Sequence, residues 1–259
     1  MPGNAGNASN ASSAGTSRNH RQGNLPAETT SFVGRTAELA ELQRLLTRSR
    51  LVTLTGVGGV GKSRLALRAG ARAQAEEVFS DGVWLVELSP LQDSALLAHT
   101  VAGALRLSDA TARPALEVLG EWLADKALLL ILDTCEHLID GCARLISSLL
   151  SVAPGLRVLA TSRQPIGVPG EQVIPVSPLP TEAEAVRLFT DRAATASPGF
   201  ALHAADRQAT AAVTDLCRDL DGLPLAIELA AGQLHAMSLE QLTERLRVRF
   251  DTLTPIGHP

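Results

Sequence analysis

The chain has 259 residues, a formal net charge of −4, 45% hydrophobic residues and 19% charged residues. These values support a packed core in one large domain or two small ones, and they exclude a chain that is disordered throughout. With 3% aromatic residues, no tyrosine and an acidic balance, the chain lacks the stacking platforms and basic surplus of nucleic-acid-binding proteins. We therefore expect no direct nucleic acid binding by this chain.

The cysteines and the hydrophobic runs indicate the cellular location that we expect for the protein. The three cysteines, Cys135, Cys142 and Cys217, form no C-x-x-C pair, which disfavours a disulfide framework or a zinc site. No apolar run reaches the ~18 residues of a membrane span, and residues 1–25 contain no hydrophobic signal segment. We expect a cytoplasmic protein without membrane attachment, in which the thiols are buried as small apolar side chains.

In chain order, the sequence divides into three parts. Residues 1–25 are mostly Asn, Ala, Ser and Gly, which predicts a disordered polar tail. Residues 26–180 alternate strand patterns with helix patterns. Pro178 and Pro180 end this region, and residues 181–259 predict a small helical domain. The last residues contain no closing element, which is typical of a chain truncated after that domain.

Apolar runs and helical patterns alternate through the middle part. The expected strands are Leu51–Thr55, Val83–Leu88, Ala127–Leu132, Leu156–Thr161 and Gln172–Val176. The expected helices are Lys62–Ala75, Ala95–Leu107, Pro114–Ala124 and Glu136–Val152. The run ALLLIL at 127–132 is apolar at every position, as in a central parallel strand that is buried on both faces. The alternation predicts an α/β fold with a doubly wound parallel sheet.

The region after residue 180 contains helix patterns only. Thr181 and Glu184 have the spacing of a capping box at the start of the first helix. Ser238 and Gln241 have the same spacing at the start of the last helix. After the first helix, the expected helices are 208–220, 225–236 and 238–248.

The strongest motif follows the first expected strand. Residues 56–63, GVGGVGKS, match the phosphate-binding loop pattern GxxxxGK[ST]. Its glycines let the backbone wrap around a phosphate with N–H groups pointing inward, and the following helix adds its positive N-terminal end. In this pattern Lys62 reaches the β- and γ-phosphates, and the hydroxyl of Ser63 ligates Mg²⁺. We assign nucleotide binding to Gly56, Gly58, Gly59, Val60, Gly61, Lys62, Ser63 and Arg64.

A phosphate loop needs a second metal ligand, and the run at 127–132 is followed by Asp133. A carboxylate at the carboxyl end of a parallel strand is placed to hold Mg²⁺. The alternative role for Asp133 is the N-cap of the next helix. Metal binding at this site is therefore assigned to Ser63 and Asp133.

Three further residues are candidates for the reaction itself. Glu136 is placed either to orient an attacking water or, as a first-turn residue, to favour the dipole of the next helix. His137 is expected to be structural. Arg163 follows another buried strand and is placed to meet a γ-phosphate, unless it is a surface arginine on a loop. The catalytic candidates are Lys62, Asp133, Glu136 and Arg163.

Five segments form a recognisable set. They are Phe32-Val33-Gly34-Arg35, GVGGVGKS, LLLILDTCEH at 128–137, LRVLATSR at 156–163 and Gly222-Leu223-Pro224-Leu225. In this order and spacing they resemble the NB-ARC-like ATPases of the STAND class. The resemblance is closest to the bacterial branch within large SARP-type and LuxR-type transcriptional regulators, and it runs from about Asn24 to Thr254.

The resemblance implies roles for particular residues. Val33 and Arg35 would lie against the adenine side of the nucleotide, and Pro224 would pack against the base from the helical domain. Asp133 would organise Mg²⁺, and Arg163 would sense the γ-phosphate. The implied cofactors are ATP or ADP with Mg²⁺. Members of this class are switches in which ADP holds a closed monomer, ATP favours an open assembling form, and slow hydrolysis resets the state.

Two departures from the family pattern bear on turnover. Thr36 stands where an acid usually follows the Gly-Arg pair, and Thr134 stands where an amide or acid usually follows the aspartate. The winged helix and the DNA-binding or repeat modules of the family are also absent from this sequence. Self-association, or association with a larger regulator protein, is therefore the expected partner interaction.

Two functions stay open at this stage. The first is an ATP- and ADP-binding regulatory switch with slow Mg-dependent hydrolysis, within a signalling or transcription-control system. The second is a non-catalytic nucleotide-binding interaction module, or a remnant of a larger regulator. A small-molecule kinase is disfavoured, because the region after residue 180 carries no cluster of Arg or carboxylates suited to an acceptor.

Overall fold

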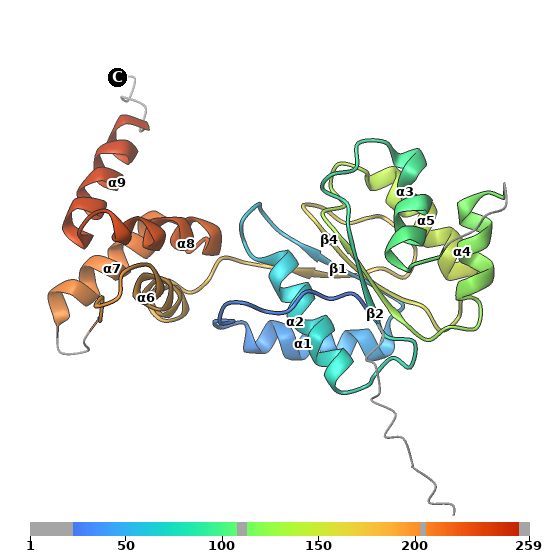
Figure 1. The fold of residues 1–259 in the computed structure, drawn as a ribbon. Coiled ribbons are helices and arrows are strands. Elements are labelled where there is room, and N and C mark those ends of the chain that lie inside the picture. The colour runs from blue at the N-terminus through green and yellow to red at the C-terminus, as the bar shows by residue number, and fades with distance from the viewer. Residues whose placement is uncertain (1–22, 108–112, 203–205, 254–259) are drawn as a thin grey trace, which may run out of the picture.

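The computed structural model describes residues 23–107, 113–202 and 206–253. Figure 1 shows two units along the chain: a sheet with helices on both faces, and a cluster of helices joined to it by the segment that leaves the last strand. Most of the predicted tail, residues 1–22, lies outside the described residues. Within the described ranges, no helix is both long enough and apolar enough to cross a lipid bilayer.

The described residues of the first unit form one parallel sheet. Its strands are β1 (Leu51–Thr55), β2 (Val83–Glu87), β3 (Leu129–Asp133), β4 (Arg157–Ser162) and β5 (Gln172–Pro175). Their order across the sheet is β2-β3-β4-β1-β5, and every pairing is parallel. The α/β class with a doubly wound parallel sheet is confirmed. Each strand end lies within two residues of its predicted position.

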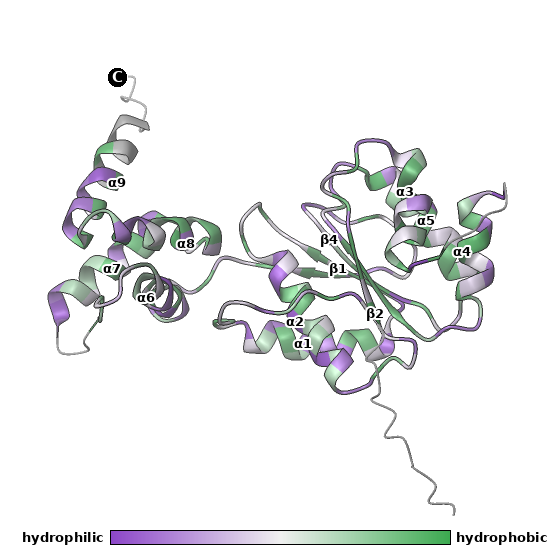
Figure 2. Cartoon of the chain, viewed as in Figure 1, coloured by the Kyte–Doolittle hydropathy of each residue, from purple (hydrophilic) through white to green (hydrophobic). Residues whose placement is uncertain are grey.

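Helices cover both faces of this sheet. Alternate strand residues pack on one face against α1 (Thr36–Arg48) and α2 (Lys62–Ala75). The other residues pack against α3 (Leu97–Ala104), α4 (Ala115–Leu123) and α5 (Ile139–Val152). A short 3₁₀ turn, Ser94–Leu96, precedes α3. Both faces of β1 to β4 are therefore buried at most positions, which explains why these strands read as largely apolar runs. The centre of the sheet is largely green in Figure 2, the colour of hydrophobic residues.

The helices of the first unit that differ most from the prediction are α1 and α5, while α3 is shorter than its predicted range of Ala95–Leu107. Helix α1 was not predicted, although Leu39, Leu42 and Leu46 are buried at the spacing of one helix face. Helix α5 begins at Ile139 rather than at Glu136, with Leu138 at its N-cap. The dipole role proposed for Glu136 and the N-cap role proposed for Asp133 are therefore both wrong.

The end of the predicted polar tail pairs with the sheet. Gly23 forms an isolated parallel bridge with Val83. The side chain of Asn24 donates a hydrogen bond to the Leu85 carbonyl (2.9 Å) and accepts one from the Leu85 N–H (2.6 Å). Strand β2 lies at the edge of the sheet, so Asn24 satisfies backbone groups that would otherwise be unpaired. Composition alone does not reveal this pairing, because Asn is also a common residue of linkers.

The second unit contains four α-helices among its described residues. They are α6 (Glu184–Ala196), α7 (Arg207–Asp219), α8 (Pro224–Gly232) and α9 (Leu239–Leu253), with a 3₁₀ turn at Gln233–His235 after α8. Their core includes Leu188, Phe189, Val213, Leu216 and Ile227. This unit therefore has a hydrophobic core of its own, separate from the two faces of the sheet.

The two predicted capping boxes have opposite outcomes. At α9, the Ser238 hydroxyl accepts from the Gln241 N–H (3.3 Å) and the Gln241 side chain accepts from the Ser238 N–H (3.1 Å), so this box is confirmed. At α6, the N-cap is Ala183 and no side chain caps the helix. The box predicted at Thr181 is wrong because the Glu184 carboxylate instead accepts from the Arg35 N–H at 3.4 Å.

Candidate functional site

The candidate site lies at the carboxyl ends of three adjacent strands. The phosphate loop follows β1, Thr161 and Arg163 stand at the end of β4, and Asp133 ends β3. Because β4 lies between β3 and β1, these groups meet at one edge of the sheet. Ligands of open α/β sheets bind at this edge.

The loop conformation depends on glycine. Gly56 has a φ of 149° and Gly59 a φ of 76°, values that side chains disfavour. A Cβ at Gly56 would stand 2.6 Å from the Val176 carbonyl oxygen, so a larger residue there would displace backbone. Helix α2 begins at Lys62, and the N–H groups of a first turn have no partner inside the helix. The loop therefore presents free donors with a positive helix end, which suits a phosphate.

Lys62 lies folded against this loop. Its ammonium donates to the Gly56 carbonyl at 2.8 Å and to the Val57 carbonyl at 3.0 Å, and the residue is 8% exposed. Burial lowers the pKa of Lys62, and the positive charge of Arg163 acts in the same direction, while the carboxylates of Glu136 and Asp133 oppose them. The other three catalytic candidates are therefore close enough to Lys62 to affect its pKa.

The Asp133 carboxylate is held by two threonines. Its Oδ1 accepts from the Thr161 hydroxyl at 2.6 Å, and its Oδ2 accepts from the Thr134 hydroxyl at 3.3 Å. Thr134 has a left-handed φ of 67°. This local conformation turns the chain out of β3 directly after the carboxylate, so Thr134 contacts the carboxylate where the family pattern has an amide or an acid.

Glu136 and Arg163 form an ion pair beside the loop. Nε of Arg163 lies 3.4 Å from Oε1 of Glu136, and Arg163 is 68% exposed. The other oxygen of Glu136, Oε2, is buried and has no hydrogen-bond partner among the described residues. A Cβ at Gly58 would stand 3.6 Å from Nη2 of Arg163, so the guanidinium lies against the phosphate loop. In contrast, His137 hydrogen-bonds the Leu91 carbonyl at 2.7 Å, in agreement with its expected structural role.

The residues expected around the nucleoside surround one narrow crevice. Val33, Arg35, Val60, Gly61, Arg64 and Pro224 line a cavity of about 30 Å³ between the two units. The helical unit closes this crevice, because the Leu225 N–H donates to the Gly59 carbonyl at 3.2 Å. Pockets that hold small molecules usually enclose roughly 300 Å³ or more. The crevice brings the predicted residues together but is too small for a purine base in this arrangement.

Arg35 also has a structural role in this crevice. Its side chain is buried, and its guanidinium donates to the Val60 carbonyl of the phosphate loop at 2.9 Å and pairs with Glu38 at 3.0 Å. Arg35 itself has a left-handed φ of 62° and stands at the N-cap of α1. The segment before α1 is thereby fixed to the phosphate loop.

A charged network, which we call the interdomain latch, crosses the same crevice. It consists of Arg64 on α2, Glu228 on α8, Arg192 on α6 and Ser31 in the segment before α1. Oε1 of Glu228 lies 2.9 Å from both Nη1 of Arg64 and Nε of Arg192. Arg64 and Arg192 also donate to the Ser31 carbonyl, at 2.5 Å and 2.9 Å.

Most of the latch was not predicted from the sequence. Arg192 and Glu228 lie far from the phosphate loop in sequence and match no local motif, so only their approach in space reveals them. Arg64 was assigned to nucleotide binding as the residue after Ser63, and in this structure its guanidinium belongs to the latch. Its predicted contact with the nucleotide stays a prediction.

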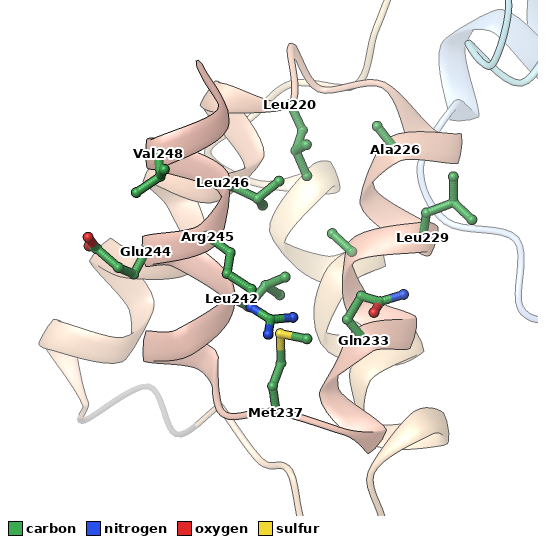
Figure 3. A pocket seen from close by; sticks show the side chains of 11 residues that line it. Leu220, Ala226, Leu229, Gln233, Met237, Leu242, Glu244, Arg245, Leu246 and Val248 are labelled. Atoms are coloured by element: carbon green, nitrogen blue, oxygen red, sulfur yellow. The ribbon is translucent and has the colours of Figure 1, made fainter. Parts of the chain in front are cut away.

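A larger hollow lies away from this chemistry. It has a volume of about 780 Å³ and lies between α8 and α9. Figure 3 shows the apolar side chains of Leu229, Met237, Leu242 and Leu246 around it, with Glu244 and Arg245 as its charged residues. Its lining has none of the phosphate-loop residues, and we assign the site to the crevice instead.

The donors present suit one kind of metal. Among the described residues, no group of three His, Cys, Asp or Glu side chains is placed to hold an ion. Mg²⁺ does not require such a group, because it retains waters and binds through one or two carboxylates together with substrate phosphates. The hydroxyl of Ser63 and the fixed carboxylate of Asp133 fit that requirement.

Comparisons with known proteins agree with this geometry. Residues 25–166 match the family described as novel STAND NTPase 1. A Mycobacterium tuberculosis protein, named as a candidate HTH-type transcriptional regulator, is 42% identical over 205 residues, which cover 79% of this chain and 22% of that protein. The regulatory protein AfsR of Streptomyces coelicolor is 30% identical over 235 residues, which cover 83% of this chain and 22% of AfsR.

A solved structure shares the fold. The Walker-type ATPase of Pyrococcus abyssi superposes with a TM-score of 0.59 at 16% sequence identity, over 89% of this chain and 76% of that protein. At this identity the likeness concerns the fold alone. The chain spans 22% of the length of the two relatives described above, so the activities of those longer proteins are not transferred here as facts.

Proposed function

This chain belongs to the novel STAND NTPase family, and we propose that it binds ATP and ADP with Mg²⁺ as a regulatory switch. The observation that carries the proposal is the phosphate loop at the carboxyl edge of the sheet, with Asp133 and Arg163 beside it. The names of its relatives support a place in transcription control or signalling. A cytoplasmic location is part of the same proposal.

Each site residue has a proposed role. The loop from Gly56 to Ser63 holds the phosphates with its N–H groups, and Lys62 neutralises their charge. Ser63 and Asp133 would hold Mg²⁺, which would neutralise phosphate charge when bound. Val33, Arg35 and Pro224 contact the nucleoside once the crevice has opened.

We also propose slow hydrolysis. Oε2 of Glu136 is buried and without a hydrogen-bond partner in the described structure, so it is free to accept a proton from a water beside the phosphate loop. Arg163 lies against Gly58 and exchanges its contact with Glu136 for the γ-phosphate. That exchange would release Glu136 only when the third phosphate is present. Thr134 supplies no second acid, which favours slow turnover.

The output of the switch needs partners. A nucleotide held between two units can bias their packing, because the gain or loss of one phosphate changes the contacts across the crevice. We propose self-association, or association with a larger regulator protein, as the response. Direct binding to nucleic acid is not part of the proposal, since the chain has a net charge of −4.

The first experiment measures ADP binding by the purified chain and by Lys62→Ala. Lys62 donates a charge-assisted contact, so its loss should weaken binding by about 2 kcal/mol, or roughly 30-fold. Lys126→Ala is the matched control, because Lys126 is the chain's other lysine and pairs with Asp125 (3.4 Å) outside the site. Equal affinity in Lys62→Ala and wild type would show that the loop does not hold the phosphates.

The second experiment tests hydrolysis through Glu136→Gln. The amide keeps the size of the side chain and removes its ability to accept a proton, so ATP turnover should fall about 100-fold while ADP affinity changes little. Phosphate release under saturating ATP provides the measurement. If wild-type turnover equals that of Asp133→Asn although ADP binds normally, the chain is a non-catalytic nucleotide-binding module.

A further inference from the structure

Thr161 connects two parts of the site. Its side chain is 1% exposed, and its hydroxyl donates to Oδ1 of Asp133 at 2.6 Å. The hydroxyl oxygen of Thr161 also accepts from the Thr134 N–H at 2.9 Å. The Thr161 carbonyl accepts from the Cys135 N–H, also at 2.9 Å. One residue of β4 therefore holds both the carboxylate at the end of β3 and the backbone that follows it.

The position of Thr161 in the sheet explains this arrangement. The register of β3 and β4 pairs Leu132 with Ala160, so Asp133 and Thr161 face each other one residue further along. There β3 leaves the sheet, since Thr134 adopts a left-handed φ of 67°. The Thr161 hydroxyl oxygen accepts from the Thr134 N–H, which in a straight strand would have donated to a backbone carbonyl. Its one proton is then directed to the carboxylate.

We infer that Thr161 is a positioning residue for the metal–nucleotide site. It fixes the rotamer of Asp133 so that a defined carboxylate oxygen is available to Mg²⁺, and it fixes the turn at Thr134. The inference rests on the proposed function, because it concerns a metal held with a nucleotide. Groups that orient a metal ligand in this way typically contribute 10- to 100-fold to metal affinity or activity.

The role of Thr161 is difficult to predict from the sequence. Thr161 ends the expected strand at 156–161, threonine is common in strands, and the candidate residue predicted at this strand end is Arg163. A hydroxyl on a central strand becomes informative only when its partners are known. Its burial matters as well, because a hydrogen bond to a charged carboxylate is stronger away from water.

The test compares Thr161→Val with Thr161→Ser. Valine keeps the shape of threonine and removes the hydroxyl, whereas serine restores it. ADP affinity is measured by calorimetry in Mg²⁺ and again in EDTA, and the ratio of the two affinities reports the gain due to the metal. Thr161→Val should bind ADP in EDTA with the affinity of wild type. Its ratio of affinity in Mg²⁺ to affinity in EDTA should be about 10-fold lower than that of wild type. Thr161→Ser should retain most of it.

Thr53→Val is the matched control. Thr53 is also a fully buried threonine of the sheet, on β1, and its hydroxyl has no partner among the described residues. Its substitution should leave the metal gain unchanged. An unchanged gain in Thr161→Val, or equal losses in Mg²⁺ and EDTA, would overturn the positioning role. A wild-type chain that binds no ADP under either condition would instead overturn the proposed function, and this inference with it.

Discussion

At the scale of single residues, Thr53 illustrates the cost of an unpaired polar group. It lies in the middle of β1, between β4 and β5, and is completely buried. Its hydroxyl finds no hydrogen-bond partner in the described part of the chain. An unsatisfied buried hydroxyl costs free energy, because it loses its water and gains nothing in return.

Removing that hydroxyl should stabilise the protein. Thr53→Val keeps the β-branched shape and replaces the hydroxyl with a methyl group, so the free energy of unfolding should rise by about 1 kcal/mol. Urea unfolding followed by circular dichroism measures the change, with a higher midpoint and an unaltered slope. A lower midpoint would mean that the hydroxyl has a partner of its own, such as an ordered water.

Residue types with a strong local signature could be assigned from the sequence. The spacing of the residues from Gly56 to Ser63 predicts a phosphate-binding loop. Asp133 can be located because it is the first residue after an apolar run. Thr161, Arg192 and Glu228 could not be assigned, because their roles depend on partners that lie far away in sequence. The contacts that position a carboxylate or join two units are therefore the part of the site that requires coordinates.

At the scale of elements, hydrophobic runs predicted the sheet well and helix starts less well. The run ALLLIL fixes a strand because burial on both faces demands continuous apolar residues. Helix α1 was not predicted although Leu39, Leu42 and Leu46 mark its buried face, because it begins after Arg35 without a side-chain cap and its start therefore has no local signature.

The two capping boxes show why spacing alone does not settle a helix start. Ser238 and Gln241 form theirs with each other at an exposed turn. Glu184 faces the segment before α1, and its carboxylate accepts a hydrogen bond from the Arg35 N–H. A tertiary contact thus replaces the local one, and α6 begins at Glu184, without a side-chain cap.

At the scale of the whole molecule, the two units meet at the crevice and the interdomain latch. Glu228 accepts from Arg64 of the first unit and from Arg192 of the second. The Ser31 carbonyl receives both arginines as well. Since the crevice encloses about 30 Å³, a nucleoside can enter only if the two units separate there, and that separation must weaken the latch.

Glu228→Gln should therefore speed up nucleotide association. The substitution preserves size but removes the charge shared by two arginines, which should destabilise the closed arrangement by about 1 kcal/mol and raise the association rate about fivefold. Stopped-flow mixing with a fluorescent ADP analogue gives the rate.

The control is Glu41→Gln, which breaks an exposed pair with Arg44 inside α1 and should leave the rate unchanged. An unchanged rate in Glu228→Gln would show that opening of the latch does not limit entry. A slower rate would contradict the restraining role of Glu228, because the loss of a negative charge does not itself hinder the approach of an anionic nucleotide.

The closed crevice also affects how long a bound nucleotide stays in the protein. A nucleotide that entered through a gap and was then enclosed by Pro224 and Leu225 leaves only as often as the gap recurs. Its dwell time would thus depend on how often the two units separate, and it would not depend on the concentration of free nucleotide. Such a molecule would keep a record of the last nucleotide it captured and respond to changes in supply with a built-in delay.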